Sequence, residues 1–290
     1  MSGKLYVVGT PIGNMGDITE RAAEVLRMAD IIAAEDTRTS LKLLGKLGVR
    51  TKLVANHKFN EQRQVDYLIG ELASGKNVAV ISDAGTPCIS DPGSILVKNA
   101  AKNGVEVIGV CGACAAVTAL SVSGFSAPSF TFYGFFPRTA GDAAKALGAV
   151  SESGVPVAVW YESPHRIKKT MEYIAVAFPE GEVCLCNDLT KIFERIYRGT
   201  PGEVIALLDG NDSFEKGEYT LVLERTAAKK EAVTEKAGLG ALIADRMLRE
   251  DITLKEAVDL LAAEHRGSIS KKELYSASLR LRSLINRDDG

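Results

Sequence analysis

Short apolar runs alternate with amphipathic stretches in the first half of the chain, and this alternation limits the possible folds more than any other feature. The runs "LYVVGT", "DIIAAED", "KLVAN", "NVAVI" and "VEVIGV" are typical of buried strands, and apolar residues recur at helical spacing between them. Strands that alternate with helices form βαβ units and a mainly parallel sheet. We therefore expect an α/β domain over residues 1–125.

The pattern restarts near residue 126 and changes again near residue 227. The stretches "SFTFYGFF", "VPVAVWY", "EVCLCND" and "EYTLVLE" read as strands with fewer clean helical crossovers, which favours a mixed sheet in a second α/β domain over 126–226. The segment after Ala227 is polar, and three helical stretches follow it, the last being "SKKELYSASLRLRSLIN". We expect residues 227–290 to form a small helical segment.

Composition and charge exclude several classes of protein. The 290 residues are 46% apolar and 25% charged, which fits a soluble globular protein of about two domains. The stretch 107–137 has no charged residue, but glycines and a proline interrupt it, so we expect a strand, a helix and a strand rather than a membrane span. Without a signal-peptide pattern we expect a cytoplasmic protein. The net charge of −2 means that any surface for nucleic acid is local.

Two cysteine pairs raise the alternatives of a zinc site and a redox pair. Cys111 and Cys114 form a C-x-x-C, and Cys184 and Cys186 form a C-x-C. A zinc ribbon usually has two C-x-x-C knuckles closer together. We expect instead small buried side chains in a reducing compartment, and no metal.

Four predicted loops leave the carboxyl ends of strands in the first sheet, where open α/β sheets bind their ligands. They are Gly9–Asp17, Glu35–Arg38, Ser82–Gly93 and Cys111–Ala115. The loop "SDAGTPCISDPG" stays irregular and polar for twelve residues, and its glycines let the backbone approach a ligand closely. A plain surface connection is the alternative for each loop alone, but four such loops together predict one binding crevice.

Two further clusters of charged residues follow predicted strands. In "AAEDTRT", Arg38 is able to hold a phosphate, and a solvated rim is the alternative. In "WYESPHRI", Glu162, His165 and Arg166 follow the central strand of the second domain, where His165 could equally be a residue at a helix start. Their spacing does not fit a metal site.

Six stretches resemble a known family in their order and spacing: "TPIGNMGDIT", "AAEDTR", "SDAGTPCISDPG", "YESPHRI", "LTKIFERIYRGT" and "EYTLVLE". They resemble the bacterial ribosomal RNA small subunit methyltransferase I family, which belongs to the tetrapyrrole (corrin/porphyrin) methylase superfamily. The resemblance covers residues 4–225, and the tail is similar to that family's helix-turn-helix-like segment. It implies two α/β domains with S-adenosylmethionine in the cleft between them and a homodimer. It also implies methylation of the ribose 2′-hydroxyl of a cytidine in the decoding region of small-subunit ribosomal RNA, either as naked RNA or in the 30S subunit.

The resemblance also implies the residues that bind the cofactor, although two loops depart from the superfamily's pattern. Its Gly-Asp-Pro loop corresponds to Gly85-Thr86-Pro87, and its Pro-Gly-Pro-Ser-Ala loop corresponds to Cys-Gly-Ala-Cys-Ala at 111–115. The second change removes two prolines and a hydroxyl, so a contact to the cofactor is lost or passes to a thiol. The implied cofactor-binding residues are Thr10, Pro11, Gly13, Asp83, Gly85, Thr86, Cys114, Ala115, Tyr161 and Thr220.

A ribose hydroxyl is a poor nucleophile, so a general base would assist methyl transfer. The candidate bases are Asp36, His57 and Glu162. Arg38 and Arg166 are candidates to hold RNA phosphates, and we expect the basic face of the last helix to contact RNA as well, through Lys271, Lys272 and Arg280. The alternatives are a methylase of a small tetrapyrrole, which would not need the tail, and a non-catalytic ribosome-binding protein.

Overall fold

The computed structural model describes residues 2–58, 60–225, 239–264 and 269–285, with side chains up to Leu279. The chain forms two compact units, residues 1–226 and 227–290. Each unit has apolar core clusters of its own.

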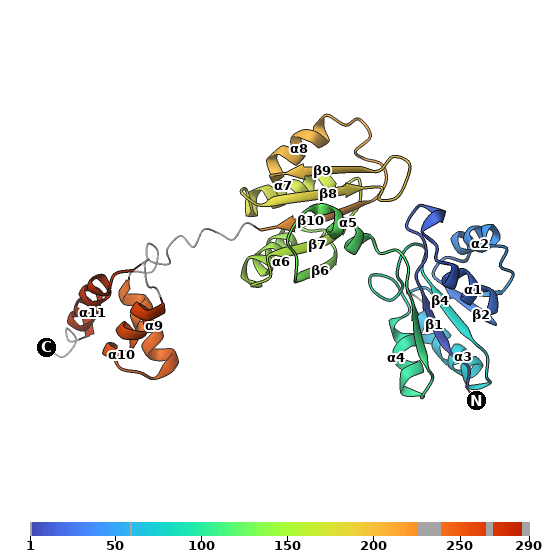
Figure 1. Cartoon of the computed structure of the whole chain (residues 1–290), viewed down its shortest axis with the longest axis horizontal. Coiled ribbons are helices and arrows are strands. Elements are labelled where there is room, and N and C mark those ends of the chain that lie inside the picture. Colours follow the sequence, from blue (N-terminus) through green and yellow to red (C-terminus); the bar gives the residue numbers. More distant parts are fainter. Residues whose placement is uncertain (1, 59, 226–238, 265–268, 286–290) are drawn as a thin grey trace. The chain divides into compact units, whose positions relative to one another are not determined.

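The first unit begins with a five-stranded parallel sheet in the order β3-β2-β4-β1-β5. Figure 1 labels its strands β1, β2 and β4. The central strand β4 is buried along its whole length, because helices cover both faces of the sheet. This confirms the α/β fold and the parallel sheet expected from the sequence. The strands are β1 (Leu5–Val8), β2 (Ile31–Ala34), β3 (Lys52–Ala55), β4 (Val78–Ile81) and β5 (Val107–Val110).

Two helices cover each face of this sheet. Val25 and Leu26 of α1 and Leu44 of α2 pack on one face, and α3 and α4 pack on the other through residues that include Leu68 and Leu96. Thr19 caps α1 by accepting a hydrogen bond from the Ala22 N–H at 3.1 Å. The helices are α1 (Glu20–Met28), α2 (Thr37–Lys46), α3 (Glu61–Ala73) and α4 (Ser94–Lys102), and a short 3₁₀ helix, η1 (Met15–Asp17), precedes α1.

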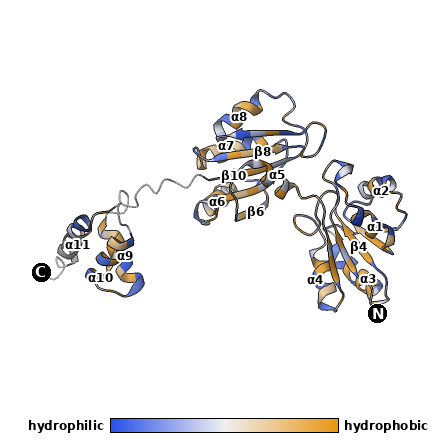
Figure 2. Cartoon of the chain, in the orientation of Figure 1, coloured by the Kyte–Doolittle hydropathy of each residue, from blue (hydrophilic) through white to orange (hydrophobic). Residues whose placement is uncertain are grey.

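The second sheet is mixed, as expected, with the order β6-β7-β10-β8-β9. Strands β6 and β7 are parallel, and the other neighbours are antiparallel. In Figure 2 the inner strands β4 and β10 are mainly hydrophobic, and the helices beside the sheets are mixed. The strands are β6 (Phe130–Phe135), β7 (Val157–Glu162), β8 (Glu182–Asn187), β9 (Arg195–Gly199) and β10 (Tyr219–Glu224).

Helices cover both faces of this sheet too. One face packs against α6 (Ala140–Glu152), α7 (Ile167–Ala177) and α8 (Pro201–Asp209) around the fully buried Trp160. The other face packs against α5 (Ala115–Ser123), whose Ala116 and Ala119 contact a cluster that includes Val159 and Val222. Helix α5 follows the first sheet in the chain but packs on the second. The expected domain boundary at residue 125 stays a prediction.

The second unit contains three described helices, α9 (Leu239–Glu250), α10 (Leu254–Glu264) and α11 (Lys271–Ile285). Their core includes Ile243, Leu261 and Leu274. Ser270 caps α11 by accepting a hydrogen bond from the Glu273 N–H, and the Glu273 carboxylate accepts hydrogen bonds from the N–H and the hydroxyl of Ser270. The polar segment 226–238 lies outside the described residues. Within the described part of the chain, no helix is long and apolar enough to cross a membrane.

Candidate functional site

A pocket of about 460 Å³ lies within the first unit, at the carboxyl ends of the first sheet's strands. All four loops singled out in the sequence contribute to its lining: Ile12, Glu35, most of 83–91, Cys114 and Ala115. The second sheet contributes Phe135, residues 161–164 and residues 218–220. The pocket is therefore lined by both sheets of the first unit.

Backbone hydrogen bonds tie the first and third of these loops together. The Thr10 N–H donates to the Gly85 carbonyl at 2.9 Å, and the Gly85 N–H donates to the Thr10 carbonyl at 3.1 Å. Gly85 has a φ of +75°, and a Cβ there would lie 3.2 Å from Cγ2 of Ile12. This left-handed conformation and the close neighbour explain why glycine is needed at this position. Thr86 extends the link by donating from its hydroxyl to the Ala113 carbonyl at 3.1 Å.

Two glycines bring the first and fourth loops into backbone contact. A Cβ on Gly112 would lie 2.7 Å from the backbone of Gly9, and a Cβ on Gly9 would lie 2.7 Å from Cα of Gly112. No side chain fits between the two loops. The close approach of the two loops therefore depends on glycine at both positions.

The beginning of α5 also faces the pocket, because Cys114 is its N-cap residue and makes no side-chain capping bond. The Ala116 N–H donates to the Tyr161 hydroxyl at 3.3 Å. Burial raises the pKa of Tyr161 to about 12, so its hydroxyl stays protonated near neutral pH. The other N–H groups at a helix start attract anionic or polar ligand groups.

The pocket has an acidic interior. Glu35, Asp83 and Asp91 line it, and the pocket lining contains no lysine or arginine. Burial is the main cause that raises the pKa of each of the three carboxyls, and repulsion from neighbouring carboxylates adds to it. Asp83 was predicted as a single residue, whereas Glu35 and Asp91 were predicted only as members of their loops. Such a pocket favours a ligand that carries positive charge.

The Glu162 carboxylate lies at the pocket but is committed to bonds that hold the turn after β7. It is 3% exposed and receives the Ser163 N–H at 2.6 Å, the Arg166 guanidinium at 2.7 Å and the Thr170 hydroxyl at 2.5 Å. Arg166 also donates to the carbonyl of Phe136 at 2.6 Å. The Glu162–Arg166 pair therefore connects the start of α7 with the end of β6.

The other two candidate bases lie outside the pocket lining. Asp36 caps α2 and pairs with the exposed Arg38 at 2.9 Å, and these bonds lower the pKa of the Asp36 carboxyl. His57 follows β3, an edge strand, and the backbone N–H of His57 donates to Oδ1 of Asn60 at 2.7 Å. The structure thus brings together Glu162 and most of the predicted cofactor residues, but not Asp36, His57 or Arg38.

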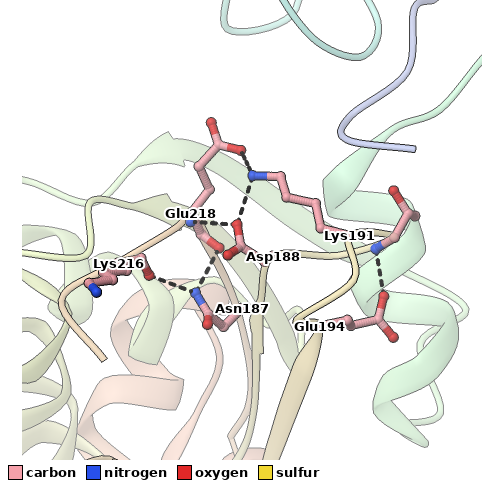
Figure 3. A network of polar contacts seen from close by, with 7 residues as sticks. Asn187, Asp188, Lys191, Glu194, Lys216 and Glu218 are labelled. Atoms are coloured by element: carbon pink, nitrogen blue, oxygen red, sulfur yellow. Dashed lines mark hydrogen bonds and ion pairs between the residues drawn. The ribbon is translucent and has the colours of Figure 1, made fainter. Parts of the chain in front are cut away.

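A polar network braces the β8–β9 loop beside the pocket, as Figure 3 shows. Lys191 bridges Asp188 and the pocket residue Glu218, each at 2.7 Å, and the Thr190 N–H donates to Glu194 at 2.5 Å. A Cβ on Gly13 would lie 2.4 Å from Cγ of Lys191, so the first glycine loop packs directly on this lysine. Glu218 was not predicted as a pocket residue from the sequence.

The remaining predicted residues lie as follows. Thr10 is buried, and neither it nor Pro11 nor Gly13 lines the pocket. The predicted residues that do line the pocket are Gly85, Thr86, Cys114, Ala115, Tyr161 and Thr220. In the second unit, Lys271 pairs with Asp259 at 2.8 Å and Lys272 is exposed. The side chain of Arg280 lies outside the described residues.

Among the described residues, no group of three or more His, Cys, Asp or Glu has an arrangement that could hold a metal ion. The sulfurs of Cys184 and Cys186 lie 3.8 Å apart in the core of the second sheet, as expected for small buried side chains, whereas Cys111 is exposed, contrary to that expectation.

The chain resembles known proteins over nearly its whole length. Residues 4–205 match the family model of the Tetrapyrrole (Corrin/Porphyrin) Methylases. A "Ribosomal RNA small subunit methyltransferase I" of Escherichia coli O157:H7 is 39% identical, over 96% of this chain and 95% of that protein. A protein of the same name from Bacillus subtilis is 38% identical, over 95% of this chain and 94% of that protein.

Two solved structures share the fold over 77% of this chain. A diphthine synthase superposes with a TM-score of 0.60 at 16% identity, over 77% of this chain and 90% of that one. A uroporphyrin-III-C-methyltransferase from Thermus thermophilus has a TM-score of 0.53 at 21% identity, over 77% and 94%. At these identities the likeness concerns the fold alone.

Proposed function

Because the chain belongs to the tetrapyrrole (corrin/porphyrin) methylase family, and within it to the ribosomal RNA small subunit methyltransferase I family, we propose that it methylates small-subunit ribosomal RNA with S-adenosylmethionine. The acceptor in this proposal is the ribose 2′-hydroxyl of a cytidine in the decoding region. The observation that carries it is the match to relatives of that name over 95–96% of this chain.

The pocket fits a cationic methyl donor. S-adenosylmethionine carries a sulfonium and an ammonium, and when bound it supplies an electrophilic methyl group. Glu35, Asp83 and Asp91 provide negative charge in a pocket without lysine or arginine. The start of α5 at Cys114 offers N–H groups for the donor's carboxylate, and the loop at Gly85 brings its backbone to the pocket wall.

The main task of this chain is to align the reacting atoms, and positioning of this kind can supply roughly 7–11 kcal/mol. The linked loops at Thr10, Gly85 and Gly112 are suited to that task, because backbone contacts join them directly. A general base would add about 10²–10⁴-fold. Asp36, His57 and Glu162 remain proposals for it. Glu35 and Asp91 join them, since they lie in the pocket and the pKa of each is raised toward neutrality.

The proposed partner is the 30S subunit or its RNA, in the cytoplasm. The exposed Lys272, together with Lys271 and Arg280 of α11, is proposed to contact RNA phosphates, as is the exposed Arg38 in the first turn of α2. Arg166 remains a proposal in the same role, although its guanidinium bonds Glu162 and two carbonyls. We also propose a homodimer, which light scattering on the purified chain tests.

The acceptor is tested by incubating the chain with methyl-labelled S-adenosylmethionine and, separately, 30S subunits, naked ribosomal RNA or a porphyrinogen. We expect label in RNA, in nucleotides that resist alkaline hydrolysis, because methylation of the 2′-oxygen blocks that cleavage. Label in the porphyrinogen would favour the small-molecule alternative. Ribosome binding without label in any acceptor would favour the non-catalytic one.

A further inference from the structure

Strand β6 carries an extra residue beside the pocket. Phe132 pairs with Val159 of β7 and Phe135 pairs with Tyr161, so three steps along β6 match two steps along β7. Gly134, at the irregularity, has a φ of +72°. This is a β-bulge, and bulges beside functional sites change the direction in which a side chain points.

The bulge exchanges the faces of two phenylalanines. Side chains alternate along a regular strand, so Phe135 would otherwise lie on the core face with Tyr133. With the extra residue, Phe136 takes the core position, where it is 1% exposed and its ring centroid lies 5.7 Å from that of Trp160. Phe135 is turned to the pocket face, with its centroid 5.7 Å from that of Tyr161.

Phe135 consequently presents an aromatic ring at the edge of the pocket. It lines the pocket and is nevertheless 64% exposed. Ile89, from the long loop after β4, also lines the pocket and is 63% exposed. The acidic pocket therefore also has two large apolar side chains in its lining that stay mostly exposed to solvent.

An RNA strand that reaches this pocket meets an acidic interior that repels its phosphates. The parts of RNA that tolerate such surroundings are the ribose and the base. Single-stranded bases stack on exposed aromatic side chains, and the stacking accepts any base because every base has a π-face. We propose, on the basis of the proposed function, that Phe135 stacks a nucleobase of the RNA acceptor and so positions its ribose at the pocket.

The test uses the full chain, S-adenosylmethionine and 30S subunits, and compares Phe135→Ala with Phe130→Ala. Phe130 is a matched control, since it lies on the same strand, is 38% exposed and does not line the pocket. We expect Phe135→Ala to raise KM for the 30S subunit roughly 5- to 150-fold, the range that corresponds to stacking of one base. Calorimetry should show an unchanged Kd for S-adenosylmethionine, and Phe130→Ala should change neither quantity.

Two more variants separate stacking from apolar contact and from folding. Phe135→Trp should keep KM near the wild-type value, whereas Phe135→Leu, which keeps an apolar side chain without an aromatic face, should raise it. Thermal unfolding of each variant shows whether the fold is intact, and the comparison of Trp with Leu holds even if the alanine variant unfolds.

Other outcomes would overturn the inference. Equal KM values for Phe135→Ala and Phe130→Ala would show that the ring does not hold the acceptor. A higher Kd of Phe135→Ala for S-adenosylmethionine would indicate that the ring contacts the donor's adenine instead. A wild-type KM for Phe135→Leu would show that apolar contact, rather than aromatic stacking, holds the acceptor. If the wild-type chain labels no RNA, the proposed function itself has failed, which is distinct from these results.

Discussion

Replacing Gly112 by alanine tests whether the close approach of two loops builds the pocket. The added Cβ would lie 2.7 Å from the backbone of Gly9, whereas ordinary van der Waals contact begins at 3.4 Å, so the loops must separate by about 0.7 Å. Overpacking of this kind typically lowers the free energy of unfolding by about 1–3 kcal/mol. For a unit of this size that corresponds to a fall in Tm of roughly 2–12 °C.

The same displacement acts on methyl transfer. A misplacement of about 1 Å at a reacting centre can lower the rate by about 10²-fold, so we expect kcat to fall by up to that factor. Gly109→Ala is the matched control, because Gly109 lies on β5 near Gly112 and a Cβ there meets nothing within 4 Å. Gly9→Ala tests the same contact from its other side.

The assays are thermal unfolding, calorimetric titration with S-adenosylmethionine, and label transfer to 30S subunits. We expect Gly112→Ala and Gly9→Ala to lower Tm, donor affinity and kcat, and Gly109→Ala to lower none of the three by a comparable amount. Wild-type Tm and donor affinity in Gly112→Ala would refute the reasoning, since the pocket would not then depend on this contact.

Three further predictions follow from single residues. Bound S-adenosylmethionine should slow alkylation of Cys114, which lines the pocket, and not of the exposed Cys111, and equal protection would contradict the placement of the donor. Burial raises the pKa of Asp91 in the folded chain, so ionisation of this carboxyl lowers the stability of the fold as the pH rises through that pKa. Asp91→Asn should therefore raise Tm at about pH 7 but not at about pH 3, where the carboxyl is protonated in both the folded and the unfolded state. Equal changes in Tm at the two pH values would contradict the raised pKa. Lys272→Ala should reduce the slope of log K for 30S binding against log salt concentration by about one unit. Lys102→Ala, which removes an exposed lysine of α4, should leave that slope unchanged, and equal slopes for the two variants would contradict an RNA contact by α11.

The sequence predicted the first sheet because helices bury both faces of its strands, so each strand reads as an apolar run. Strand β9 was missed for the opposite reason, since "RIYRG" lies at the sheet edge and none of its residues is buried. Helix α8 was also missed, although Thr200 and Glu203 form a capping box around Pro201, which is a readable signal.

The pocket loops were predictable because parallel strands deliver their carboxyl ends to one edge of a sheet. Which side chains reach the pocket depends on strand order and register, which the sequence does not display. The loop at His57 follows edge strand β3 and does not contribute to the pocket lining. Asp36 caps a helix, and Phe135 reaches the pocket only through a bulge.

The measurement that tests the central claim most directly is mass spectrometry of nucleosides from 30S RNA incubated with S-adenosylmethionine and either the wild-type chain or Gly85→Val. Valine cannot easily adopt the φ of +75° at this position, and its Cβ would crowd Ile12, so the variant should lose the donor site while the two sheets stay folded. We predict 2′-O-methylcytidine with the wild-type chain and none with Gly85→Val. A methyl group on a base, or equal amounts of 2′-O-methylcytidine with a folded Gly85→Val variant, would contradict the account.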